Sequence, residues 1–229
     1  MKRSVLFIIL CSLFISHAVA QNIIRPKIAG PNGLWVNSYN GVLFFGQTDI
    51  ETQNTAMPMQ LRFYYNSSAK NTNYGYGLGF SLGYEMRYDI DEDGNVTIET
   101  GDGRTDTYTR YGEEFEAPAG VFSTLTYSEG KYILTEKTGE TYEFANPQHK
   151  KLTAQTDRQG NRTTLTYTLV EGDLQSPLLT QIQDAVGHTI TLEYTNKLLT
   201  RATASFLNGS ITYAYDSKQR LTKRTDAMG

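Results

Sequence analysis

The sequence has little cysteine and little histidine, and both shortages limit the chemistry that it can perform. Its 229 residues include one cysteine, Cys11, and three histidines. Cys11 lies in an N-terminal segment that we expect to be removed, so the mature chain has no thiol for a disulfide, a metal site or a nucleophile. His149 and His188, the histidines beyond that segment, show no paired ligand spacing and form no Ser-His-Asp arrangement. We therefore expect a protein without enzymatic activity and without a cofactor.

The chain also lacks a strong excess of charge of either sign. It has 21 Lys and Arg residues against 24 Asp and Glu residues, a formal net charge of −3. Without Lys2 and Arg3, the mature chain keeps 19 basic residues against 24 acidic ones, a net charge of −5. Nucleic acids and anionic membranes are bound by basic surfaces. We expect neither as a partner.

The first residues have the pattern of a secretory signal peptide. Lys2 and Arg3 precede an apolar run over residues 5–15, and Ala-Val-Ala stands directly before Gln21. The run is shorter than the roughly 20 residues that a membrane-spanning helix needs, and no later segment is apolar enough to cross a bilayer. We expect cleavage before Gln21 and a secreted or extracytoplasmic protein, with the cell surface as one possible location.

Tyrosine, glycine and β-branched residues are abundant. There are 16 tyrosines and 20 glycines, and Thr, Val and Ile alternate with apolar residues in "VTIET", "TTLTYT", "TITLEY" and "SITYAY". Alternation with period two, interrupted by Gly, Asn and Asp about every 8 to 12 residues, is typical of strands joined by turns. We predict an all-β fold. The segment "SPLLTQIQDAVGH" also fits a helix capped by Ser176, but the repeat described next favours a strand there.

The C-terminal third of the chain is a repeat. Units aligned on Leu-Thr pairs start 27, 20 and 22 residues apart. A period near twenty with a central turn predicts one hairpin per unit, in the order strand, Asp-x-x-Gly turn, strand. The positions that define the repeat are Leu152, Asp157, Gly160, Tyr167, Leu179, Asp184, Gly187, Tyr194, Leu199, Tyr215, Asp216, Arg220, Leu221, Asp226 and Gly229.

Aspartates recur in these units at positions 157, 184 and 226. A carboxylate can act as a general acid or base. An aspartate that returns two or three residues before a turn glycine is instead typical of a turn cap, which accepts hydrogen bonds from backbone N–H groups. We interpret the aspartates as structural.

One unit carries a family resemblance. Tyr215-Asp216-x-x-x-Arg220-Leu221-Thr222 resembles the Tyr-Asp-x-x-Gly-Arg-Leu-Thr unit of the YD-repeat, or RHS, family, with Gln219 in the glycine position. Residues 36–68 and 76–110 resemble the leader region of that family. The resemblance implies a strip of β-hairpins that curves into a hollow shell. In bacterial members the shell encloses a C-terminal toxic domain, and in animal teneurins it belongs to an adhesion receptor.

The resemblance also implies an organisation for this chain. It comprises a signal peptide (1–20), an N-terminal linker (21–35), a leader β-region (36–150) and hairpin repeats (151–229) with an incomplete last unit. The implied function is a non-enzymatic scaffold for toxin delivery or presentation, whose effector would lie beyond Gly229. The implied partners are the remainder of a longer repeat chain or its effector, and a cell-surface or glycan partner.

An alternative function is a self-contained secreted adhesion or carbohydrate-binding module, because tyrosines and Trp35 could stack on sugars or on a partner protein. The two hypotheses differ in the role of the last strand. A strand follows the turn glycines Gly160 and Gly187, whereas none follows Gly229. On the scaffold hypothesis we expect "RLTKRTD" to be an open sheet edge.

The segment "DIDEDGNVTIET" is a candidate calcium loop. Asp89, Asp91 and Asp93 alternate before Gly94, and Glu99 stands one place before the usual closing glutamate. The flanking sequences alternate as strands do, which favours a hairpin turn over a loop between helices. We therefore expect calcium to leave the fold unchanged.

A second motif, "YGYGLGFSLGY", superficially matches a phosphate-binding loop. Such loops precede a helix, whereas the residues after Gly83 alternate like a strand. We expect Gly75, Gly77 and Gly79 to let two backbones approach closely while the interleaved aromatic side chains pack.

Overall fold

The computed structural model describes residues 28–29, 34–36, 41–53, 57–170 and 173–226. The predicted signal peptide, most of the linker and Gly229 lie outside these residues. Within the described part of the chain, no helix has the length and apolar character needed to cross a membrane.

The described chain is almost entirely β, as the sequence predicts, and forms three antiparallel sheets. The first sheet contains β1 (Ile28–Ala29), β2 (Trp35–Val36), β3 (Leu43–Glu51), β4 (Gln60–Asn66) and β5 (Phe80–Leu82). The second contains β6 (Arg87–Ile90), β7 (Val96–Glu99), β8 (Thr105–Tyr111) and β9 (Glu114–Glu116). A short 3₁₀ turn, η2 (Ser67–Ala69), follows β4.

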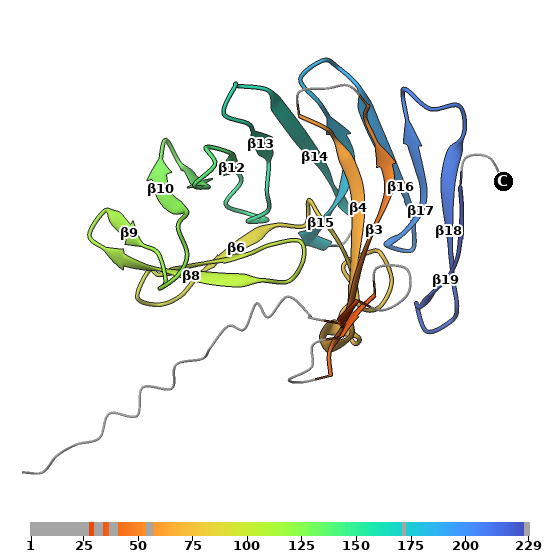
Figure 1. Cartoon of the computed structure of the whole chain (residues 1–229), viewed down its shortest axis with the longest axis horizontal. Coiled ribbons are helices and arrows are strands. Elements are labelled where there is room, and N and C mark those ends of the chain that lie inside the picture. The colour runs from red at the N-terminus through yellow and green to blue at the C-terminus, as the bar shows by residue number, and fades with distance from the viewer. Residues whose placement is uncertain (1–27, 30–33, 37–40, 54–56, 171–172, 227–229) are drawn as a thin grey trace, which may run out of the picture.

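The third sheet has ten strands in sequence order and is the predicted strip of hairpins. Its strands are β10 (Thr124–Ser128), β11 (Lys131–Thr135), β12 (Thr141–Phe144), β13 (Ala154–Thr156), β14 (Arg162–Val170), β15 (Asp173–Gln183), β16 (Thr189–Thr195), β17 (Leu198–Ala204), β18 (Ser210–Tyr215) and β19 (Leu221–Thr225). The sheet is open and curved, and runs from β10 at one end to β19 at the other (Figure 1). The segment that also fitted a helix is strand β15. The expected boundary at residue 150 falls between β12 and β13 of this continuous sheet.

The curvature has a repeated local cause. The register of the ladder shifts before Tyr167, Tyr194 and Tyr215, the tyrosines that close three successive units. At each shift the facing strand has one extra residue, and that residue is the threonine of the next Leu-Thr pair. Because a β-bulge bends its strand and increases the local twist, each unit adds a similar bend to the sheet.

Each bulged threonine makes the same kind of hydrogen bond. The hydroxyl of Thr180 donates to the carbonyl of Thr166, that of Thr200 to Glu193, and that of Thr222 to Ala214, at 3.2, 3.2 and 3.1 Å. The acceptor is always the residue before the closing tyrosine. The hydroxyl therefore bonds to a carbonyl beside the interrupted ladder.

The same tight turn joins many of the strands. In each case the first residue accepts a hydrogen bond from the N–H three residues later and donates its own N–H to the carbonyl four residues later. The turns span residues 91–95, 100–104, 136–140, 157–161, 184–188 and 216–220. Their fourth residue has positive φ and is glycine in five turns, whereas Gln219 occupies that position in the sixth with φ of 60°.

The three sheets share one core. In β4, Leu61 and Phe63 are buried while the alternating residues 60, 62 and 64 lie on the other face. Phe63 packs against Tyr213 of β18, with ring centroids 5.5 Å apart. From the second sheet, Tyr88 contacts Tyr132 at 4.8 Å between ring centroids. Burial of each large apolar side chain contributes about 1.5–3 kcal/mol, so these contacts hold the sheets together.

Candidate functional site

The leucines and tyrosines of the repeat form a regular structural contact. Leu152, Leu179 and Leu199 are buried. The Tyr194 hydroxyl donates to the carbonyl of Leu179 at 2.9 Å, and Tyr215 donates to Leu199 at 2.8 Å. Each tyrosine therefore ties the end of its unit to the leucine that opens it. Leu221, the leucine that opens the fourth unit, is half-buried against the core.

The first unit departs from this pattern. The Tyr167 hydroxyl is buried and has no hydrogen-bond partner in the described part of the chain. The His149 ring lies 5.1 Å from the Tyr167 ring, and the Lys151 ammonium lies 5.7 Å from its centroid. The amide of Leu152 donates to the carbonyl of Met86 at 2.9 Å. The first unit is thus the one that bonds directly to the segment between β5 and β6.

Three repeat aspartates, Asp157, Asp184 and Asp216, bond to backbone N–H groups of their own turns, whereas the turn expected after Asp226 extends into residues outside the described part of the chain. Asp157 Oδ1 accepts from the amides of Gln159 and Asn161, both at 2.9 Å. The carboxylates of Asp184 and Asp216 do the same, and Asp216 also pairs with Arg220. The hydrogen bond from the Asn161 side chain to Asp157 Oδ2, at 2.7 Å, and these backbone hydrogen bonds lower the pKa of Asp157. Asp184 also contacts a histidine of its own turn, since its Oδ2 atom lies 2.8 Å from His188 Nδ1.

The glycine-rich loop lies against the repeat tyrosines. A Cβ atom on Gly75 would stand 3.2 Å from the Lys197 carbonyl, and one on Gly77 would stand 3.1 Å from the Tyr215 ring. The loop also bonds to the repeats through the Leu199 amide, which donates to Gly75 at 2.8 Å. The glycines therefore permit a close approach between the leader region and two repeat units.

A buried polar cluster lies beneath this loop. The Lys151 ammonium pairs with Glu85, and the Tyr76 hydroxyl donates to the second oxygen of Glu85 at 3.3 Å. Burial raises the pKa of Tyr76 well above its ordinary value, and it also raises that of Tyr194. Removing either partner of such a pair would leave an uncompensated buried charge. The cluster connects the leader region, through Glu85 and Tyr76, to the first repeat, through Lys151.

The calcium candidates do not converge on one point. Asp89 pairs with Lys150 at 2.6 Å, and this hydrogen bond lowers its pKa. Glu99 pairs with Arg87 at 2.6 Å. Asp91 accepts the amides of Asp93 and Asn95 and so caps the turn between β6 and β7. The described residues contain no group of three His, Cys, Asp or Glu side chains placed to hold a metal ion.

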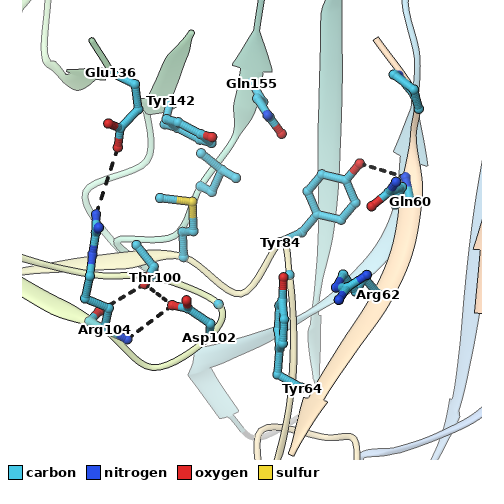
Figure 2. Close-up of a pocket in the computed structure, with 15 residues that line it drawn as sticks. Gln60, Arg62, Tyr64, Tyr84, Thr100, Asp102, Arg104, Glu136, Tyr142 and Gln155 are labelled. Atoms are coloured by element: carbon cyan, nitrogen blue, oxygen red, sulfur yellow. Dashed lines mark hydrogen bonds and ion pairs between the residues drawn. The ribbon is translucent and has the colours of Figure 1, made fainter. Parts of the chain in front are cut away.

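A pocket of about 390 Å³ lies where the three sheets meet. Figure 2 shows Arg62 and Tyr64 of β4 on one wall and Arg104 and Glu136 on the other, with Tyr84 between them. Tyr142 and Gln155, cross-strand partners in β12 and β13, complete the lining. This volume lies within the range of small-molecule sites, about 300–1,000 Å³.

On the wall that contains Arg104, the charged side chains form ion pairs and hydrogen bonds with neighbouring residues of the protein. Arg104 lies 2.9 Å from the buried carboxylate of Asp106 and 4.0 Å from Glu136. The Thr100 hydroxyl donates to Asp102 at 2.5 Å. Burial, with the nearby carboxylates of Glu140 and Glu136, raises the pKa of Tyr142 to about 12. The phenol of this tyrosine is therefore a neutral hydrogen-bonding group at physiological pH.

Sequence reasoning did not find this pocket. Its lining comes from β4, the segment before β6, the turn after β7, and β12 and β13, so no short motif contains it. Sequence reasoning also assigned no role to the threonine of each Leu-Thr pair, although its recurrence was visible in the repeat.

Comparison with protein families places part of the chain in a family model. A family model described as a domain of unknown function, DUF6531, matches residues 33–108, about a third of the chain. The match spans β2 to most of β8 and includes the glycine-rich loop and Arg62. No curated protein matches the chain.

Proposed function

We propose that this chain is a secreted, non-enzymatic scaffold that forms part of a larger YD-repeat, or RHS, shell. The observation that carries the proposal is the bulge at Tyr167, Tyr194 and Tyr215, which recurs once per unit. A sheet that bends by a similar step at every hairpin curves steadily as units are added. Steady curvature is what a strip needs to enclose a space.

The leader region supports this proposal by its position. Its sheet packs on the repeats through Phe63 and Tyr213, and its glycine-rich loop lies on Tyr215. In the described residues, β19 pairs with β18 alone and so is an edge of the ten-stranded sheet. A further hairpin could pair along that edge by the same ladder. The proposed partners are accordingly more of the same repeat chain, or an effector that it encloses.

The proposal is tested by reading the gene beyond the codon for Gly229. An open frame with further Tyr-Asp units, in a protein whose electron micrographs show a closed hollow particle, is the expected result. A stop codon at that point would contradict the shell. Export is tested separately by the intact mass of the secreted protein, which should begin at Gln21.

A second candidate is a self-contained adhesion or carbohydrate-binding module. The specific observation in its favour is the polar pocket beside Tyr64, Tyr84 and Tyr142. The same reading of the gene distinguishes the two, since a small module requires no further repeats.

A further inference from the structure

Arg62 is a positioned cation at the wall of the pocket. Its Nη1 donates to the Thr48 hydroxyl at 3.0 Å, and its guanidinium lies 5.4 Å from the centroid of the Tyr64 ring. On the neighbouring strand, a Cβ atom at Gly46 would stand 2.9 Å from Nη2, so the glycine leaves space for the guanidinium. Among the described residues, no carboxylate lies within ion-pair distance of Arg62. Its charge is available to a ligand.

Several other lining groups have unused hydrogen-bonding capacity. Within the described structure, the amide of Gln155 and the hydroxyls of Tyr64 and Tyr142 make no hydrogen bond to the protein. The hydroxyl of Tyr84 differs, because it accepts from the Gln60 amide at 3.3 Å. The pocket thus combines one unpaired cation with neutral donors and acceptors and the faces of aromatic rings, while its carboxylates, Asp102 and Glu136, lie on the opposite wall and are bonded there to Thr100 and Arg104.

We propose that this pocket binds one sugar residue that carries a carboxylate, a hexuronic acid. The carboxylate would bond to Arg62, because a guanidinium recognises a planar carboxylate through two parallel hydrogen bonds. The sugar hydroxyls would bond to Gln155 and Tyr142, and the ring would lie against an aromatic side chain. This inference is independent of the scaffold function, since a pocket can bind its ligand whether or not the chain is part of a shell.

The lining favours a sugar over a peptide that ends in a carboxylate. An apolar peptide side chain needs an apolar subsite, whereas two of the three apolar lining residues, Met86 and Leu152, are buried, with exposed fractions of 6% and 0%, and Pro58 alone is exposed. The groups that face the pocket are mostly amides, hydroxyls and charged side chains. Such groups match the many hydroxyls of a sugar.

Isothermal titration calorimetry tests the proposal with the purified mature chain and four probes. These are glucuronic acid, its methyl ester, glucose, and an N-acetylated dipeptide with a free carboxylate. Because a hydrogen bond to a charged group contributes roughly 1.5–3 kcal/mol, glucuronic acid should bind about tenfold or more tightly than glucose or the ester. Equal binding of the acid and its ester, no binding of the acid, or tighter binding of the dipeptide would overturn the proposal.

Two variants locate the site. Arg62→Gln keeps a donor for Thr48 and should weaken glucuronic acid about tenfold or more while leaving glucose unchanged. Gln155→Ala should weaken both sugars. The matched control is Arg201→Gln, on the exposed face of β17 and outside the pocket, which should leave both affinities unchanged. Melting temperatures show whether each variant is folded. Equal affinity in folded Arg62→Gln would remove the pocket as the binding site.

Discussion

The Tyr213 hydroxyl donates a hydrogen bond of 2.6 Å to Asp49, which connects β18 to β3 across 164 positions of the chain. Arg224 of β19 approaches the other oxygen of the same carboxylate at 2.8 Å. The geometry of that second contact is not that of a hydrogen bond, since neither atom has a hydrogen-bond partner. Asp49 is therefore a buried carboxylate held by one directed bond and one ion pair, both from the last repeat strands.

Replacing Tyr213 with phenylalanine should lower the free energy of unfolding by about 2 kcal/mol. The change removes the directed bond and leaves the buried carboxylate with the ion pair alone, and hydrogen bonds to charged groups contribute about 1.5–3 kcal/mol. Urea denaturation measures the difference. The control is Tyr111→Phe, because Tyr111 is 61% exposed. Equal stability of the two variants would contradict the structural role of the contact.

Thr200→Val should lower the free energy of unfolding by about 1 kcal/mol, because it keeps the shape of the side chain and removes the bond to Glu193. Thr191→Val, at an exposed position of the neighbouring β16, is the matched control and should have a smaller effect. If both variants unfold at the same urea concentration as the native protein, the bulge hydroxyl has no structural importance.

Gln219→Gly should raise the free energy of unfolding by about 1 kcal/mol, because glycine adopts positive φ without the steric cost of a Cβ atom. The change loses the exposed hydrogen bond of 3.0 Å from Asn73 but keeps the backbone bond from Leu78. The reverse change, Gly160→Ala, should lower stability by a similar amount, since nothing lies within 4 Å of its Cβ position and the cost is that of the backbone alone. Changes of the same sign in both variants would rule out this explanation.

Stability should fall in alkaline solution. Burial raises the pKa of Tyr84 and Tyr142 to about 12, and it raises that of Tyr76 as well. Above the unfolded pKa of about 10 the unfolded chain loses phenolic protons that the folded chain retains. The contribution of these tyrosines is thus complete below pH 10 and is lost as pH rises towards 12. Urea denaturation across this range should show the decline, and a constant free energy of unfolding would refute it.

Calcium should leave the melting temperature unchanged. Lys150 pairs with Asp89, Arg87 pairs with Glu99, and Asp91 caps its turn, so three of the four candidate ligands already have a partner. Titration of calcium with the mature chain is the measurement. A saturable rise in melting temperature that Asp91→Asn abolishes would establish a calcium site and contradict this expectation.

The features that sequence reasoning found are local in the chain. Strand alternation and the Asp-x-x-Gly turns are encoded within about ten residues, so the all-β fold and the order of hairpins could be predicted from segments such as the one around Asp157. The contact of Tyr213 with Asp49 and the lining of the pocket by Arg62 and Gln155 depend on how the sheets pack. No spacing along the chain reports such packing, because it is decided by three-dimensional complementarity between distant segments.

The recurring bulge also bears on how proteins with this architecture can change in length. Each bend is determined at the junction of two successive units, by the tyrosine that closes one unit, such as Tyr194, and the threonine of the Leu-Thr pair that opens the next, here Thr200. A duplication or deletion of one whole unit therefore preserves the angle between the units that remain. The number of units therefore determines the circumference of such a strip, and tandem duplication can enlarge it without compensating changes elsewhere. An insertion of part of a unit would instead shift the bulge relative to the repeat.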